Sequence, residues 1–410
     1  MNQNHYPKDE AFHKSLSGRY RTASIWQGIF FSALAIAILS LIALLYNVVD
    51  GAFGYVAYEY KKDPASFTTK ALGDLTQQEL LEILTTNLSQ GAFTKLDNEK
   101  PMTKRSKSDL YTLVLERLIQ IDTQQTWSMT DSIFRADEIK AEVAKQYPDA
   151  KLEFRSWLTP VFLSTPMSSK AEFAGVRTAI LGSLWMVGIA ILFALPIGTG
   201  AAIYLQEYAS KNFINNIIQT NINNLAGVPS IVYGMLGLAI FVRALEPFTS
   251  GSLFGVTDSN GRTILSAGLT MGTLVLPLII INAQEAIKAV PDSLRQAAFG
   301  VGATRWQTVW HHVLPNALPG ILTGSILAVS RAIGETAPLI VVGASTFISI
   351  DPDGPFSKFT ALPIQIYQWT TRAQSEFHSI AAAAIIVLLI LLLTLNASAI
   401  LLRNRVQRKY

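Results

Sequence analysis

Long apolar stretches alternate with polar segments along the chain. Six of these stretches approach or exceed the roughly 20 residues that a helix needs to cross the hydrocarbon core of a bilayer. They occupy residues 25–49, 178–205, 227–242, 263–284, 318–348 and 379–402. The third must extend back into the polar stretch NNLA to reach a full span. Because backbone groups in lipid must be hydrogen-bonded within their own segment, the pattern predicts six transmembrane helices.

The polar segment between the first two spans, residues 50–177, is long enough to form a domain of its own. Thr76 followed by Glu79 has the capping-box pattern of a helix start. Apolar residues then recur at helical spacing: Leu80, Leu81, Ile83 and Leu84; Leu110, Leu113, Val114 and Leu118; Ile139 and Val143. These patterns predict a mainly helical insert. We expect a packed cap, and a docking surface or sensor is the alternative.

Composition agrees with a membrane protein. Of the 410 residues, 50% are hydrophobic and 15% are charged, and the mean hydropathy is +0.31. This is too apolar for an ordinary soluble protein. The chain has no cysteine, which excludes disulfides and thiolate metal sites. It also lacks the G-x-x-x-x-G-K-[ST], H-E-x-x-H and G-x-S-x-G motifs, so we expect no catalytic centre, metal site or cofactor.

Lysine and arginine collect on one side of the predicted spans. With the N-terminus inside, twelve fall in inside segments: Lys8, Lys14, Arg19, Arg21, Lys211, Lys288, Arg295, Arg305, Arg403, Arg405, Arg408 and Lys409. Short outside loops hold four: Arg243, Arg262, Lys358 and Arg372. This bias predicts cytoplasmic tails at residues 1–24 and 403–410 and an extracytoplasmic insert. The first span is long for a signal-peptide core, and we expect an uncleaved anchor.

Residues 285–317 link the fourth and fifth spans on the predicted cytoplasmic side. Pro291 is well placed to open a short helix. Gly300 and Gly302 both suit a turn with positive φ. A second short helix would follow and stop near Pro315. The pattern predicts two helices at a sharp angle, and the alternative is an amphipathic loop on the membrane surface.

This loop resembles the coupling loop of ABC-transporter permeases. The family pattern is Glu-Ala-Ala, three residues, Gly, nine residues, Ile, one residue, Leu-Pro. The chain has Gln296, Ala297, Ala298, Gly302, His312, Leu314 and Pro315 at these positions, so Gln replaces Glu and His replaces Ile. The stretches IYLQEYA, LAGVPSIVYGMLG, SRAIGETAPLIVVGAS and ALPIQIYQW resemble, more narrowly, the phosphate-specific permeases of the PstA family.

The resemblance implies a fold and a function. The fold is an all-α integral membrane protein, in which residues 178–402 form a type I importer (MetI-like) core with five transmembrane helices. The function is that of a permease subunit of an ATP-driven inorganic phosphate importer in the bacterial inner membrane. The implied partners are a second permease (PstC-like), two ATP-binding subunits (PstB-like) and an extracytoplasmic phosphate-binding protein (PstS-like). Import of another oxyanion and a membrane-anchored sensor are the alternatives.

Arg331 and Glu335 stand near the middle of the fifth apolar stretch. A lone arginine at the bilayer centre costs about 2.5–3.5 kcal/mol, so it should be paired or face a water-filled path. Four residues apart on a helix, the two side chains can pair. One interpretation is a buried ion pair that fixes helix packing. The other is an anion path, since a guanidinium binds phosphate through two parallel hydrogen bonds. The resemblance implies a path lined by these two residues and Thr336.

Overall fold

The computed structural model describes residues 9–68, 70, 72–99, 101–210, 212–256 and 260–407. Within this part of the chain, five helical segments are long and apolar enough to cross a membrane. They are built on α1 (Asp9–Ala52), α8 (Arg177–Ile203), α12 (Ile264–Lys288), α15 (Leu314–Gly334) and α18 (Ser375–Gln407). These helices match the first, second, fourth, fifth and sixth predicted spans, although α15 is shorter than predicted.

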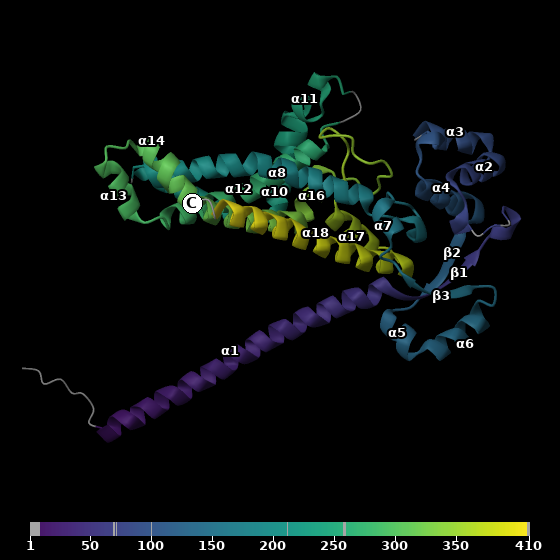
Figure 1. The fold of residues 1–410 in the computed structure, drawn as a ribbon, viewed down its shortest axis with the longest axis horizontal. Helices are drawn as coiled ribbons and strands as arrows, with labels where there is room; N and C mark the ends of the chain where they lie inside the picture. Colours follow the sequence, from purple (N-terminus) through teal and green to yellow (C-terminus); the bar gives the residue numbers. More distant parts are fainter. Residues whose placement is uncertain are drawn as a thin grey trace, which may run out of the picture.

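Helix α12 forms the centre of the bundle and packs against α8 and α15 (Figure 1). Small residues allow this close approach. A Cβ atom added to Gly268 or Gly272 of α12 would lie 2.7 Å from the side chain of Ile189 or Phe193 of α8. Close backbone packing through glycine is the usual way for helices to associate in lipid, where the hydrophobic effect does not favour association.

The third predicted span is not one straight helix. It consists of α9 (Phe213–Ala226) and α10 (Ser230–Gly237), which continues as the π-helix η7 (Leu238–Ala244). The two halves meet at an angle of 105°. The break falls at Gly227–Pro229, where proline cannot donate a helical hydrogen bond. Together the halves make either one broken span or a re-entrant pair, so the bundle has up to six spans.

The predicted fifth span, 318–348, is also interrupted. Helix α15 ends at Gly334, and the short helix α16 (Ala337–Val342) begins three residues later. Pro338 explains the break, because its ring would clash with the carbonyl of Gly334, four residues earlier, in a continuous helix. Proline is well suited to the first turn of α16, where it lies.

Helix α1 leaves the bundle at an angle, and none of the residues in its apolar window is buried within this chain (Figure 1). It meets the bundle near its C-terminal end. There, a Cβ atom on Gly51 would lie 3.2 Å from the Cβ of Ala382 in α18.

The insert between α1 and α8 contains helices, as predicted, and also a sheet that was not predicted. The strands β1 (Phe53–Tyr60), β2 (Ile121–Thr126) and β3 (Lys151–Ser156) form an antiparallel sheet in the order β2-β1-β3. The helices are α2 (Gln77–Asn87), α3 (Gln90–Glu99), α4 (Lys107–Leu113), the π-helix η4 (Val114–Ile119), α5 (Met129–Phe134), α6 (Ala136–Gln146) and α7 (Pro160–Ser164). The predicted capping box at Thr76 and Glu79 is confirmed.

The insert is joined to one end of the bundle by a shared apolar cluster. Val56 of β1, Trp157 and Phe162 pack there with Phe377 and Ile380 of α18. The far end of the bundle carries α13 (Asp292–Gly300) and α14 (Arg305–Thr308) (Figure 1). The insert and these two short helices therefore lie at opposite ends of the membrane helices.

Candidate functional site

Arg331 lies in the last turn of α15, and Glu335 is the residue at which that helix ends. The Nε atom of Arg331 lies 3.7 Å from Oε1 of Glu335. The predicted pair therefore forms, although the helix ends between the two residues. Thr336 precedes α16 and is half-buried. Glu335 and Thr336 therefore form the break between α15 and α16, and Arg331 lies one turn before it.

This pair is not buried within the chain. The side chain of Arg331 is 58% exposed and that of Glu335 is 22% exposed. The prediction that Arg331 falls in the middle of a helical span is wrong, because Pro338 ends the helix early. A separation of 3.7 Å is also longer than a charge-assisted hydrogen bond, which usually measures about 2.7–2.9 Å. The contact is a loose ion pair that leaves guanidinium donors accessible.

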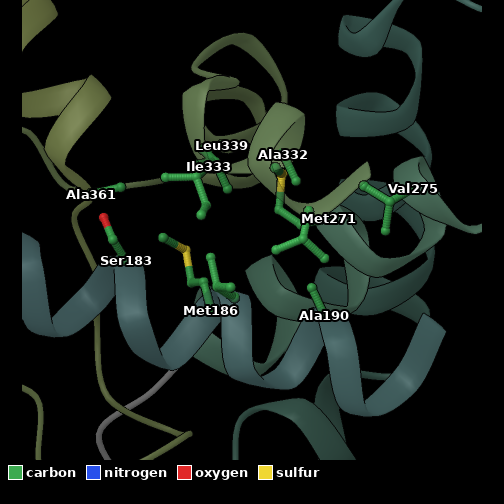
Figure 2. Close-up of a pocket in the computed structure, with 11 residues that line it drawn as sticks. Ser183, Met186, Ala190, Met271, Val275, Ala332, Ile333, Leu339 and Ala361 are labelled. Carbon is green, nitrogen blue, oxygen red and sulfur yellow. The ribbon is translucent and has the colours of Figure 1, made fainter. Parts of the chain in front are cut away.

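A small cavity borders the break on its buried side (Figure 2). It measures about 20 Å³ and is lined by Met186 and Ala190 of α8, Met271 of α12, Ala332 of α15 and Leu339 of α16, among others. Its one polar lining side chain, Ser183, already accepts a hydrogen bond from the Leu362 amide, at 3.0 Å. This cavity has room for about one water molecule and no donor set for an anion. It is a gap in packing rather than a ligand site.

The second helix break packs beside the first. Gly234 of α10 approaches α16 so closely that a Cβ atom would lie 2.7 Å from Cα of Pro338. The hydroxyl of Tyr233 donates a 2.8 Å hydrogen bond to the carbonyl of Leu225, near the end of α9. The same carbonyl accepts a 3.1 Å hydrogen bond from the amide of Val228, so two donors hold the end of α9 at the break. Both interrupted helices therefore meet through α10 and α16.

The predicted turn of two short helices is present between α12 and α15. We call residues 292–308 the knob: α13, a turn at Gly302, and α14. Gly302 has φ +86°, as expected, whereas Gly300 belongs to α13 and does not have positive φ. The prediction that the second helix stops near Pro315 is wrong. The π-helix η9 (Val309–Val313) continues from α14 directly into α15.

The residues of the coupling-loop pattern divide between surface and interior. Gln296, Ala297 and Gly302 are exposed, whereas Ala298 is buried, and Leu314 and Pro315 are half-buried. Trp306 and Trp310 are also exposed, and their rings stack with centroids 5.3 Å apart. Phe299 and Val301 extend the apolar surface. A clustered apolar surface of this kind marks an interaction site.

One contact of the knob was not predicted from the sequence. The Nη2 atom of Arg295 in α13 donates a 2.8 Å hydrogen bond to Oε1 of Glu207, in the π-helix η6 (Tyr204–Tyr208) that ends α8. Their side chains are only 14% and 12% exposed. Both residues lie in or beside stretches that resemble permeases, but they are 88 positions apart. Periodicity and local motifs carry no signal for such a pair.

The sequence also matches a known protein family. The sequence profile of a family described as "Binding-protein-dependent transport system inner membrane component" matches residues 194–410. The chain belongs to this family. It is therefore a permease, a multi-pass inner-membrane component of a transport system that depends on a binding protein, and not itself an enzyme.

Individual relatives of the permease cover most of the same region. It is 33% identical over 211 residues to "Probable ABC transporter permease protein YqgI" of Bacillus subtilis, with 51% of this chain and 67% of the relative covered. It is 36% identical to "Phosphate transport system permease protein PstA" of Mycobacterium leprae, covering 50% and 62%. "Phosphate transport system permease protein PstC" of Haemophilus influenzae is 33% identical, covering 49% and 66%. The matches thus span about two thirds of each relative.

Proposed function

We propose that this permease carries inorganic phosphate across the bacterial inner membrane as one half of the path of an ATP-driven importer. The observation that carries the proposal is the exposed guanidinium of Arg331 at the break between α15 and α16. Relatives named as phosphate permeases support the choice of substrate.

The cost of a charge in lipid supports a path at this position. An arginine facing hydrocarbon is costly, so the 58% of the side chain left exposed should meet a partner or water rather than lipid. A guanidinium can donate two parallel hydrogen bonds to phosphate. Glu335, at 3.7 Å, would compete for the same donors and help the anion to leave. Thr336 lies next to them and would add a hydroxyl.

The proposal includes partners at both ends of the bundle. A second, PstC-like permease would face the α15–α16 break and complete the path. Two PstB-like ATP-binding subunits would bind the knob through its exposed apolar surface. A PstS-like phosphate-binding protein would deliver substrate from the insert side. Both termini would then be cytoplasmic, and residues 50–177 extracytoplasmic.

Uptake by the reconstituted complex tests the proposal. The permease, purified with its partners, would be placed in vesicles, and ATP-dependent uptake of phosphate, sulfate and a phosphonate would be compared. We expect ATP-dependent uptake of phosphate. Excess sulfate should not reduce this uptake. Preferred uptake of sulfate or phosphonate would instead assign the site to another oxyanion.

A second candidate is a sensor role for the insert. A cavity of about 330 Å³ lies between the sheet and the start of α18, and Tyr58, Tyr60, Tyr111 and Arg155 are among the residues that line it. This volume is at the lower limit of ligand pockets. Binding of a small molecule to the insert, with transport unchanged when these tyrosines are replaced by phenylalanine, would favour the sensor.

A further inference from the structure

The guanidinium of Arg295 joins three segments at the knob end of the bundle. Besides Glu207, it contacts the end of α12. Its Nη2 atom donates to the carbonyl of Ile287 at 2.9 Å, and Nη1 donates to the carbonyl of Val290 at 2.6 Å. Nη1 also lies 3.1 Å from Oδ1 of Asp292 at the start of α13. One side chain thus connects α13, the end of α12 and the end of α8.

These contacts use chemistry that few other side chains provide. Arg295 supplies donors to the carbonyl of Ile287, in the last turn of α12, and to that of Val290, two residues beyond the helix. Arginine has five N–H donors in a rigid planar fork, whereas lysine has three on one flexible point charge. Because the pair with Glu207 is largely buried, loss of either partner leaves an uncompensated charge. The joint should therefore be stiff.

The rest of α13 is attached more loosely. Ala298 is its one fully buried residue, and Leu294 is half-buried against the neighbouring apolar cluster. Apolar contacts of small side chains have no fixed direction and permit sliding. Gln296, Ala297 and Phe299 are exposed and remain available to a partner. A force applied to this exposed surface would reach α8 through the polar contacts of Arg295.

We propose that Arg295 is the positioning residue that passes displacement of the knob to α8, with Glu207 as the group on α8 that receives it. The knob and the adjacent ends of α8 and α12 would then move as one body when the ATP-binding subunits close. This inference deepens the proposed function and relies on it for the identity of the partner that moves the knob.

A distance measurement tests whether the segments move together. Because the chain has no cysteine, spin labels at Gln206→Cys and Gly300→Cys would be unique. Both positions are exposed, and nothing lies within 4 Å of a Cβ at Gly300. In the complex, we expect one narrow distance distribution that stays the same without nucleotide and with a slowly hydrolysed ATP analogue. In Arg295→Lys, the distribution should broaden and change with nucleotide.

Two results would overturn the proposal. One is a distance in the parent that changes between nucleotide states, because the knob and α8 would then move separately. The other is an Arg295→Lys distribution identical to that of the parent. Neither result depends on the identity of the transported anion, so the labels decide the inference even if phosphate is not the substrate.

Coupling efficiency provides the functional readout. Phosphate uptake per ATP hydrolysed should fall by roughly tenfold in Arg295→Lys and in Glu207→Gln, while recovery of the complex and ATP hydrolysis persist. Arg19→Lys is the matched control, since this exposed arginine lies on α1, outside the knob; its ratio should equal that of the parent. Arg295 would only stabilise the fold if phosphate uptake, ATP hydrolysis and recovery of the complex all fell together. An unchanged ratio of uptake to hydrolysis would lead to the same conclusion. If the parent takes up no phosphate, the proposed function fails instead.

Discussion

The guanidinium of Arg331 has one ion-pair partner among the described residues, Glu335, and the contact is too long for a hydrogen bond. Its remaining donors are therefore accessible to a ligand or to a partner subunit. A pair this exposed differs from a buried ion pair, in which removal of one partner typically destabilises the protein by about 3–5 kcal/mol. The two interpretations of this pair predict different outcomes for the same variants.

We expect Arg331→Gln to lower phosphate uptake about a hundredfold or more while the complex still assembles. The variant loses two charge-assisted hydrogen bonds to the anion, each contributing about 1.5–3 kcal/mol. Arg331→Lys keeps the charge without the planar fork and should be impaired, and Glu335→Gln should alter uptake without loss of assembly. Uptake and recovery of complex would be measured for all three and for Arg331→Gln with Glu335→Gln. Full uptake by the double variant would show that the pair is only structural.

Glu79 provides a pH prediction in the insert. A hydrogen bond from Lys70, with further bonds from Thr76, lowers the pKa of Glu79 from 4.5 to about 2. A carboxyl whose pKa is lowered by folding stabilises the folded state above its ordinary pKa, and this stabilisation is lost as pH falls from about 4.5 towards 2. Hydrogen exchange of the α2 amides in the intact protein, corrected for intrinsic rates, should speed up over this range. Glu79→Gln should remove the dependence, and an equal dependence in parent and variant would contradict the assignment.

At the scale of elements, features encoded by neighbouring residues could be predicted from the sequence. Features that depend on residues far apart in the chain could not. The capping box of α2 lies within four residues, and the helical spacing of Leu110 and Leu113 within one turn, so both were found in the sequence. A local perturbation at Pro338 follows from its clash with the carbonyl of Gly334, but the predicted span ran on to residue 348 because the apolar run continues through the break. The sheet was missed because neither β2 nor β3 has a fully buried residue.

The turn of the knob gives a prediction about backbone conformation. No heavy atom lies within 4 Å of a Cβ at Gly302, but its φ of +86° strains a branched residue. Gly302→Val should therefore distort the knob, weaken recovery of the ATP-binding subunits and lower uptake. Gly302→Asn should retain both, because asparagine tolerates this conformation. Gly300→Ala is the control, since Gly300 is helical and has no neighbour within 4 Å. Equal activity of all three variants would remove the turn from the coupling mechanism.

At the scale of the whole molecule, the pairing of elements across the bundle depends on long-range contacts. The 88-residue separation of Glu207 and Arg295 and the approach of Gly234 to Pro338 bring together segments that no local pattern relates. The five long apolar helices among the described residues were predictable, because each apolar stretch is a local property of the chain. The angle between α9 and α10 was not, because it depends on how both halves pack on α12.

The topology of the bent helix pair is the last prediction. If α9 and α10–η7 cross the membrane as one broken span, Leu253, in the turn that follows, lies on the same side as the insert. A re-entrant loop would instead start α12 on the side where α8 ends, which disagrees with the parallel contacts of Gly268 with Ile189 and of Gly198 with Ile279. The charge bias of twelve against four favours a crossing.

Single cysteines at Lys95, Leu253 and Arg305, all exposed, would be unique in this cysteine-free chain. We expect an impermeant thiol reagent to label Lys95→Cys and Leu253→Cys in intact spheroplasts, and Arg305→Cys only after permeabilisation. Labelling of Arg305→Cys in intact cells, with Leu253→Cys protected, would contradict this topology and place the knob out of reach of ATP-binding subunits.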